Sequence, residues 1–189
     1  MAVYTSAHVL LFDNTVQNND LGAVTLADPN GETTCPDSPF PFLGDDCGEG
    51  INLNGASFAV LYGNVMQGNQ GGILMSNELG ATHDNVILRN QVLNNVSDCG
   101  ITMASNPEGC DESGAPRGGI EISSDASAGA APITDTLVYG NMITNQEVGV
   151  WVGSTAISPT IHVNRNWLGA ATVGVQNAGT GTLNATQNH

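Results

Sequence analysis

One short phrase recurs along the chain and constrains its fold more than any other feature. In its clearest copy, at residues 60–75, an apolar run ends at Asn64, a second asparagine follows at Asn69, and Gly72 precedes another apolar run. Further copies are anchored on the asparagines that correspond to Asn64, namely Asn14, Asn90, Asn141, Asn166 and, incompletely, Asn188. Successive anchors lie about 25 residues apart or about twice that, and such a repeat is typical of a solenoid whose coils stack on one another.

The apolar runs are short and rich in valine, isoleucine, leucine and tyrosine, with asparagine and glycine at their ends. This pattern predicts β-strands. The chain has no long stretch whose apolar residues recur with a 3.6-residue period, so we do not expect helix as a main element. Equivalent strands of adjacent coils would lie about 4.8 Å apart. Equivalent asparagines would then form a ladder in which Asn64 hydrogen-bonds between Asn14 and Asn90. We therefore expect these asparagines to be structural rather than catalytic.

Two of the intervals between anchors are about twice as long as the others, and each contains an excursion rich in proline, glycine and aspartate. The excursions run from about residue 28 to 50 and from about residue 104 to 118, and the chain returns from them on similar phrases at residues 50–53 and 119–122. We interpret them as insertions into single coils, because no anchor lies midway. The prediction is one all-β domain over residues 1–189, a parallel solenoid of about six coils with two loop excursions.

The four cysteines lie in or beside these excursions, and the pairing that we favour is Cys35 with Cys47 and Cys99 with Cys110. Each bridge would close one irregular local loop, although four cysteines allow three connectivities. A zinc site is the alternative, but the chain has no C-x-x-C and its histidines have no ligand spacing. Because disulfides form in oxidising compartments, the pairing predicts an extracellular or cell-surface protein.

The phrases at residues 62–69 and 139–145 resemble the right-handed parallel β-helix repeat of the pectate-lyase-like superfamily, which also occurs in Asn-rich surface proteins. The resemblance covers nearly all of the chain outside the excursions and implies a right-handed parallel β-helix. Because that superfamily includes lyases, hydrolases, epimerases, adhesins and phage spikes, it implies no single function. Residues 182–189 resemble the start of a terminal coil, and we expect the chain to be part of a longer protein.

The strand before each anchor is apolar on both faces. The residues three positions before the anchors are expected to point inward: Leu11, Leu61, Ile87, Val138, Val163 and Ala185. The alternate positions should point outward, yet most of them are also apolar: Leu10, Val60, Val86, Leu137 and His162, with Phe12, Tyr62, Leu88, Tyr139 and Asn164. Strands that are apolar on both faces are usually covered on both, so we expect a loop, another chain or a ligand on this sheet.

Aromatic residues give the candidate binding site. Phe12, Tyr62 and Tyr139 share one outward column and could form a platform for sugar rings, or they could pack beneath a loop or a neighbouring chain. The strand after the glycine adds Trp151, which is expected to point outward, with packing at a coil edge as the alternative. The inward column of that strand is expected to contain Ala23, Ile73, Ile101, Val150 and Val175.

Most acidic residues lie in or beside the two excursions, which would emerge from the solenoid about 10 Å apart. Carboxylates gathered there would suit Ca²⁺, a hard cation that takes oxygen ligands. The candidate ligands are Asp45, Asp46, Glu49, Asp111 and Glu112. Neither loop has the spacing of an EF-hand, and a solvated acidic rim is the alternative interpretation.

Catalysis is the competing hypothesis for some of these residues. A glycoside hydrolase needs an acid and a base or nucleophile at a defined separation, and the candidates are Asp45, Asp46, Asp111 and Glu112. The resemblance also implies lyases that use an arginine or lysine base beside Ca²⁺, and Arg89 and Arg165 both lie directly before an anchor. The chain lacks the further signatures of polygalacturonase-like enzymes and of alginate epimerases.

Charge restricts the partners. The chain has 18 acidic residues against three arginines and no lysine, for a net charge of −15. Nucleic acid and anionic membranes would be repelled, so we expect neither nucleic-acid binding nor membrane insertion. Open solenoid ends would also allow copies to stack. The sequence favours a structural, self-associating or carbohydrate-binding surface module, whose partner is a polysaccharide or another chain, itself included. A polysaccharide lyase or glycoside hydrolase, with or without Ca²⁺, is the alternative.

Overall fold

A computed structural model describes residues 1–19, 49–69, 71–95, 118–122, 131–153, 156–169 and 171–189. Within these residues the protein is all-β, and its only helical element is a short 3₁₀ turn, η2, at Ser158–Thr160. All strand pairings in this part of the chain are parallel, and the strands lie in three sheets. This arrangement is that of a parallel β-solenoid, as the repeat predicts.

The described strands divide among three sheets that we number 1 to 3. Sheet 1 has the order β1 (Ala2–Tyr4), β4 (Glu49–Asn54), β7 (Gly71–Ser76), β10 (Gly118–Ile122), β13 (Val148–Val152) and β16 (Val173–Asn177). Sheet 2 contains β2 (Leu10–Phe12), β5 (Val60–Tyr62), β8 (Asn85–Leu88), β11 (Thr136–Tyr139) and β14 (Ile161–Asn164). Sheet 3 contains β3 (Thr15–Gln17), β6 (Val65–Gln67), β9 (Gln91–Leu93), β12 (Met142–Thr144) and β15 (Trp167–Gly169).

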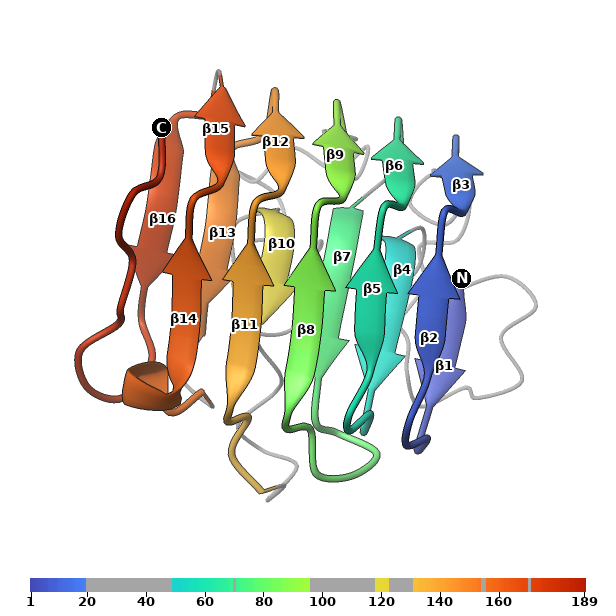
Figure 1. Ribbon diagram of the computed structural model, residues 1–189, viewed down its shortest axis with the longest axis vertical. Helices are drawn as coiled ribbons and strands as arrows, with labels where there is room; N and C mark the ends of the chain where they lie inside the picture. Colours follow the sequence, from blue (N-terminus) through green and yellow to red (C-terminus); the bar gives the residue numbers. More distant parts are fainter. Residues whose placement is uncertain (20–48, 70, 96–117, 123–130, 154–155, 170) are drawn as a thin grey trace, which may run out of the picture.

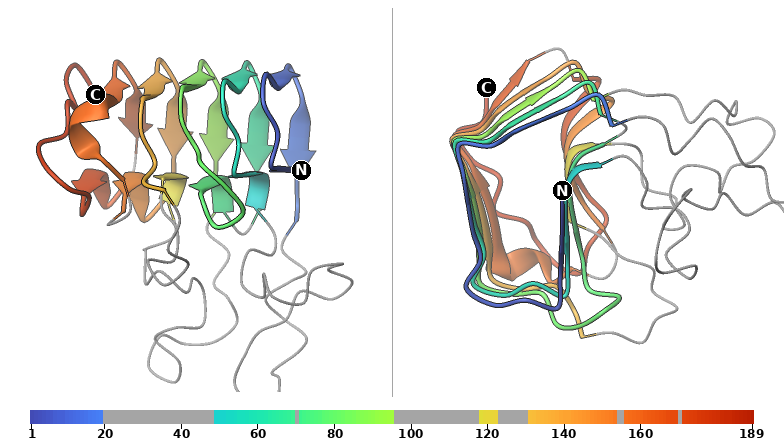
Figure 2. Two further views of the ribbon diagram at one scale, coloured as in Figure 1. Left: turned by 90° about the horizontal axis from the view of Figure 1, so that it is seen from below. Right: turned by 90° about the vertical axis from the view of Figure 1, so that its right-hand side faces the viewer.

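The chain passes through the sheets in the same order in each coil. Strands β1, β2 and β3 form the first coil, β13, β14 and β15 form the fifth, and β16 begins a sixth that continues to residue 189. Figure 1 shows the coils side by side, with the two termini at opposite ends of the stack. Viewed along the stacking direction, the coils superimpose and the sheets form three sides of the cross-section (Figure 2).

The predicted asparagine ladder is confirmed. Asn64 donates from its backbone N–H and from Nδ2 to Asn90 Oδ1, at 2.9 Å in both cases, and its own Oδ1 accepts the same two bonds from Asn14. Its Nδ2 also donates to the Leu11 carbonyl in the preceding coil. The same step recurs along the ladder through Asn90, Asn141, Asn166 and Asn188. Buried amides are thereby satisfied at every inner step.

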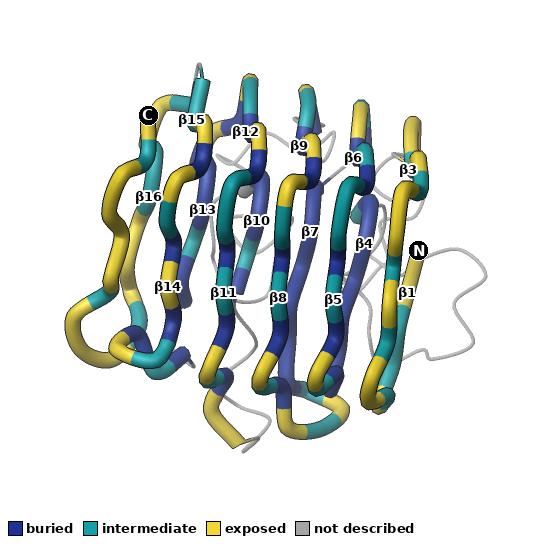
Figure 3. Tube along the Cα trace, viewed as in Figure 1, coloured by how far each residue is buried: buried dark blue, intermediate teal, exposed yellow. Residues whose placement is uncertain are grey.

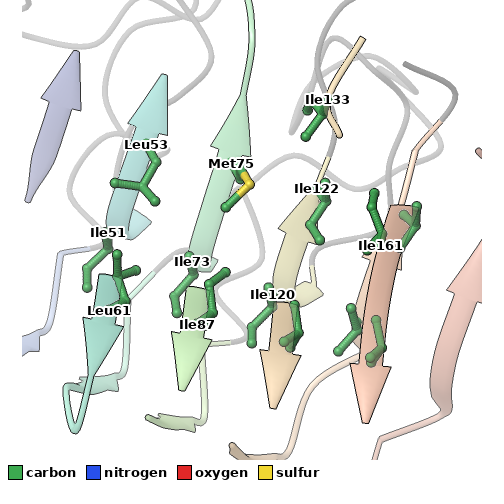
Figure 4. Packing of buried hydrophobic residues seen from close by; sticks show 14 of the residues in the cluster. Ile51, Leu53, Leu61, Ile73, Met75, Ile87, Ile120, Ile122, Ile133 and Ile161 are labelled. Carbon is green, nitrogen blue, oxygen red and sulfur yellow. The ribbon is translucent and has the colours of Figure 1, made fainter. Parts of the chain in front are cut away.

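The core lies inside the coils and is built from the predicted inward column together with residues of sheet 1. Leu61, Ile87, Val138 and Val163 are fully buried. Figure 4 shows how these chains meet across the solenoid, with Ile51 of sheet 1 close to Leu61 of sheet 2. The last expected member of the column, Ala185, is exposed in the terminal coil.

The two return phrases supply strands β4 and β10 of sheet 1. Ile51 pairs with Ile73, and Ile120 lies in register between Ile73 and Val150. Ala23 and Ile101, the residues predicted for the inward column of this strand, lie outside the described residues.

Glycine occupies the corner between sheets 3 and 1. A Cβ on Gly119 would meet the side chain of Ile143 and would lie 2.8 Å from the Gly149 carbonyl oxygen. A Cβ on Gly72 would meet Gly119 in the same way. The corner therefore needs a residue without a side chain, and Gly119 meets this requirement directly before Ile120.

Candidate binding face

The outer surface of sheet 2 consists of two columns in strand register, which we call the sheet 2 face. One column contains Leu10, Val60, Val86, Leu137 and His162, and the other contains Phe12, Tyr62, Leu88, Tyr139 and Asn164. In the inner strands these residues are half-buried while their neighbours are fully buried, which confirms the predicted alternation. In the first coil Leu10 is 66% exposed and Phe12 is 55% exposed. The protein thus presents a largely apolar sheet surface.

The aromatic rings of this face stack along the solenoid axis. The rings of Phe12 and Tyr62 are stacked with centroids 5.3 Å apart and an interplanar angle of 7°. Each ring therefore covers one face of the other, in a favourable aromatic arrangement. Phe12, Tyr62 and Tyr139 lie in one outward column, as predicted. Because the stacking uses ring faces, the edges of the Phe12 and Tyr62 rings are left for an outside partner.

Arginines lie along the edge of the sheet 2 face, at the corner with sheet 3. Arg165 Nη1 donates to Tyr139 Oη at 2.7 Å, and the Arg165 guanidinium carbon lies 5.6 Å from the centroid of that ring. Arg89 Nη1 donates to Tyr62 Oη at 3.4 Å. Each pair joins a tyrosine of one coil to an arginine of the next, and the two pairs lie two coils apart. The sequence placed both arginines at one repeat position but gave no sign of their contact with the tyrosines.

The backbone at this corner is left-handed in every coil. Positive φ angles occur at Asp13, Gly63, Arg89, Gly140, Arg165 and Gln187. For residues with a side chain this conformation is unfavourable by about 1–2 kcal/mol, and it also occurs at other corners of the coils, as at Phe58 and Asn145. At this position of successive coils, glycine alternates with longer side chains in the second to fifth coils. A Cβ on Gly140 would lie 3.7 Å from Arg89 Cγ.

Trp151 lies on another sheet from the three aromatic candidates. Val150 and Val152 beside it are fully buried, so the half-buried Trp151 points to the outside of sheet 1, as expected. Its Nε1 is buried and has no hydrogen-bond partner among the described residues. The structure does not bring Trp151 together with Phe12, Tyr62 and Tyr139, and its role in binding stays a prediction.

Two apolar side chains that the sequence did not single out lie on the outer surface of sheet 3. Trp167 is 58% exposed and Met142, its neighbour in register, is 38% exposed. Both directly follow a ladder asparagine, and this shared position is the signal that could have identified them. Trp167 lies two residues beyond Arg165, across the buried Asn166. An apolar side chain therefore continues the surface beyond the arginine corner.

Most of the loop candidates lie outside the described residues: Asp45, Asp46, Asp111 and Glu112, with Cys35, Cys47, Cys99 and Cys110. Glu49 is the half-buried first residue of β4. In the described ranges no three or more histidine, cysteine or acidic side chains are grouped as metal ligands. The calcium site, the two disulfides and catalysis by the loop carboxylates stay predictions.

Comparison of the chain with protein-family models, curated proteins and solved structures found no match. The resemblance to the pectate-lyase-like superfamily therefore stays an expectation from the repeat. In the part of the chain that the structure describes, no helix has the length and apolar character needed to cross a bilayer.

Proposed function

We propose that the protein is an extracellular structural β-helix whose sheet 2 face binds a polysaccharide. The observation that carries this proposal is the repeated pair of tyrosine and arginine on an apolar surface. Tyr62 with Arg89 and Tyr139 with Arg165 place hydroxyl and guanidinium groups at equivalent positions. An extended polymer that followed the solenoid axis would meet one such pair about every 10 Å.

The chemistry of these groups suits a sugar polymer. The guanidinium has five N–H donors in a fixed geometry, and the bond to tyrosine uses only one of them at Arg89. The tyrosine hydroxyl can donate as well as accept. Leu88 and the ring edges add apolar contact for sugar C–H groups. Binding would combine hydrogen bonds from the arginine corner with apolar contact, rather than stacking on a flat aromatic platform.

The finer features of the fold belong to this proposal. The solenoid would be right-handed, as parallel crossover connections generally are, and would belong to the pectate-lyase-like superfamily that its phrases resemble. Disulfides Cys35–Cys47 and Cys99–Cys110 would close the two excursions, and Ca²⁺ would bind their carboxylates. These features support an extracellular or cell-surface location, where disulfides persist.

Binding to a panel of neutral and acidic polysaccharides, measured by calorimetry and by affinity electrophoresis, tests the proposal. We expect at least one polysaccharide to bind, and Tyr62→Ala/Tyr139→Ala to lower its affinity about tenfold or more, a loss of about 1.4 kcal/mol. Gln91→Ala, on the exposed surface of sheet 3, should leave the affinity unchanged. Absence of binding across the panel, or full affinity in the double tyrosine variant, would refute the assignment.

An enzyme is the second candidate, because Arg89 and Arg165 occupy equivalent strained positions beside the same surface. A lyase would need one of them as the base that removes a proton next to a uronate carboxylate. The same panel with Ca²⁺, followed by ultraviolet absorbance of unsaturated products, separates the candidates. Product formation that is lost in Arg89→Ala or Arg165→Ala would favour the lyase over a binding module.

A further inference from the structure

The chain contains two sequences of the form Asn-x-Ser/Thr, which is the acceptor sequence for N-linked glycosylation. One begins at Asn95 and ends at Ser97, and the other begins at Asn184 and ends at Thr186. The two are equivalent as sequence motifs, but the structure places their asparagines in opposite environments. Because a glycan is bulky and hydrophilic, an asparagine that carries one must lie at the surface of the folded protein.

Asn95 is part of a second asparagine ladder inside the coils. Its side chain is fully buried. Asn95 Nδ2 donates to the Met66 carbonyl at 3.1 Å, and Asn95 Oδ1 accepts from the backbone N–H and from Nδ2 of Asn69 at 2.9 and 3.0 Å. The close-packed interior has no room for a sugar on this nitrogen, and the modification would also disturb the buried hydrogen bonds. A correctly folded chain therefore cannot carry a glycan on Asn95.

Asn184 lies on the outside of the solenoid. It is exposed, and it pairs in register with His162 of β14, so it continues the outward column of the sheet 2 face that contains His162. Asn164 Nδ2 donates to Asn184 Oδ1 at 3.2 Å, a bond that uses only the amide oxygen. Among the described residues, Asn184 Nδ2 donates to no acceptor. The nitrogen that would receive a sugar is therefore available on an exposed side chain.

The exposure of this position does not depend on whether another coil follows. His162 has a paired neighbour on each side, Leu137 in β11 and Asn184, and it is nevertheless exposed. Side chains of this column point away from the core, and a further coil would pair with the strand edge rather than cover the outer face. Figure 3 shows the segment that follows β16 as largely exposed beside β14.

The third residue of the acceptor sequence lies on the same outer face. Thr186 is exposed, and its Oγ1 accepts from Asn164 Nδ2 at 2.9 Å and donates to Asn184 Oδ1 at 3.5 Å. The hydroxyl and the amide of the acceptor sequence thus lie side by side at the surface. A glycosylated asparagine keeps its Oδ1 and one N–H, so both contacts are compatible with the modification.

We propose that Asn184 carries an N-linked glycan and that Asn95 carries none. The donor is a lipid-linked oligosaccharide diphosphate, used by a transferase of the secretory route. A C–N bond forms between Asn184 Nδ2 and the anomeric carbon, the anomeric C–O bond breaks with its electron pair leaving on the diphosphate, and Nδ2 loses one proton to solvent. The modification rests on the extracellular location proposed above. It does not require polysaccharide binding, because the tyrosine–arginine pairs lie along the other edge of the sheet 2 face.

Peptide mapping by mass spectrometry tests the proposal on the full chain, expressed through the secretory pathway of a eukaryotic cell. We expect a glycan on the peptide that contains Asn184, unmodified Asn95, and aspartate at position 184 after release with a peptide N-glycosidase. Asn184→Gln and Thr186→Ala should each abolish the glycan. The matched control, Thr186→Ser, keeps the acceptor sequence and the surface hydroxyl, and should keep the glycan.

Two results would overturn the proposal: a wild-type chain without a glycan on Asn184, or a glycan on Asn95 in protein with the circular dichroism spectrum of the folded state. Protein that remains inside the cell is mapped in the same way, so poor secretion does not weaken the test. Asn184→Gln leaves both tyrosine–arginine pairs intact, and its affinity for polysaccharides therefore tests the binding face alone. Failure of the glycosylation site and failure of the binding face are thus distinguishable.

Discussion

Arg165 holds the hydroxyl of Tyr139, one coil earlier, through a 2.7 Å hydrogen bond, while its guanidinium carbon lies 5.6 Å from the centre of the tyrosine ring. Arg89 and Tyr62 repeat the hydrogen bond at 3.4 Å. At exposed sites a cation over an aromatic ring contributes about 0.5–1 kcal/mol, which is no more than the cost of left-handed backbone at an arginine. The pairs therefore contribute little to the stability of the fold, and the proposed binding of a polysaccharide would account for their repetition.

Replacement of both arginines should separate binding from stability. In Arg89→Gly/Arg165→Gly the left-handed backbone strain is relieved, and Gly63 and Gly140 show that glycine is accommodated in this column. We expect the free energy of unfolding to change by less than about 1 kcal/mol in either direction, because strain relief and the lost contacts offset one another. The affinity for the polysaccharide should fall about tenfold. Thermal unfolding and calorimetry measure the two quantities, and a large loss of stability with full affinity would contradict this assignment.

The asparagine ladder should be costly to interrupt. Asn90 donates to the Leu61 carbonyl and to Asn141 Oδ1, both at 3.0 Å, and accepts two bonds from Asn64. Asn90→Ala would leave several buried polar groups unpaired, at about 1–3 kcal/mol each. We expect a loss of about 3 kcal/mol or more in chemical denaturation. The neighbouring exposed residue provides the control, Gln91→Ala, with a change below about 0.5 kcal/mol. Equal effects of the two variants would show that the ladder is not a main source of stability.

Corner glycines should tolerate no side chain. In Gly119→Ala the new methyl group would collide with Ile143 and with the Gly149 carbonyl oxygen, so we expect a loss of about 1–3 kcal/mol or failure to fold. Gly80→Ala is the matched control, because its methyl group would lie 3.7 Å from Gly55 Cα, an ordinary contact. The melting temperature should fall by several degrees in the first variant and stay close to wild type in the second. A stable Gly119→Ala protein would argue against the corner packing.

The cysteine pairing can be tested by peptide mapping without reduction. We expect one linked pair of peptides from Cys35 with Cys47 and another from Cys99 with Cys110. Each bridge would close a short loop, and its reduction should then lower the free energy of unfolding by about 2–4 kcal/mol. Free thiols in the oxidised protein, or a link between the two excursions, would contradict the pairing. Protection of the cysteine thiols that depends on zinc rather than on oxidation would favour a zinc site.

The repeat made the inner architecture predictable. The spacing of Asn64, Asn90, Asn141 and Asn166 indicated the ladder, because a buried amide needs partners and stacked coils supply them at every step. The alternation around Leu61 likewise indicated which residues point inward, since side chains along a strand alternate between two faces. These features are local and repeat in each coil, so a single sequence contains enough information to predict them.

Other features depended on contacts between distant segments. Several apolar phrases could have filled the place between β7 and β13, and in the structure Ile120 lies there, in register with Ile73 and Val150. The hydrogen bond from Arg165 to Tyr139 joins residues 26 positions apart, and no spacing rule pairs those side chains.

The sequence by itself determined the solenoid, its coil length, its asparagine ladder and its inward columns, because these follow from a local period. Only the tertiary structure decided which phrases complete sheet 1 and which arginines contact which tyrosines. The physical reason is that strands of similar composition compete for the same neighbours. The competition is resolved by strand pairing between coils, which no single repeat contains.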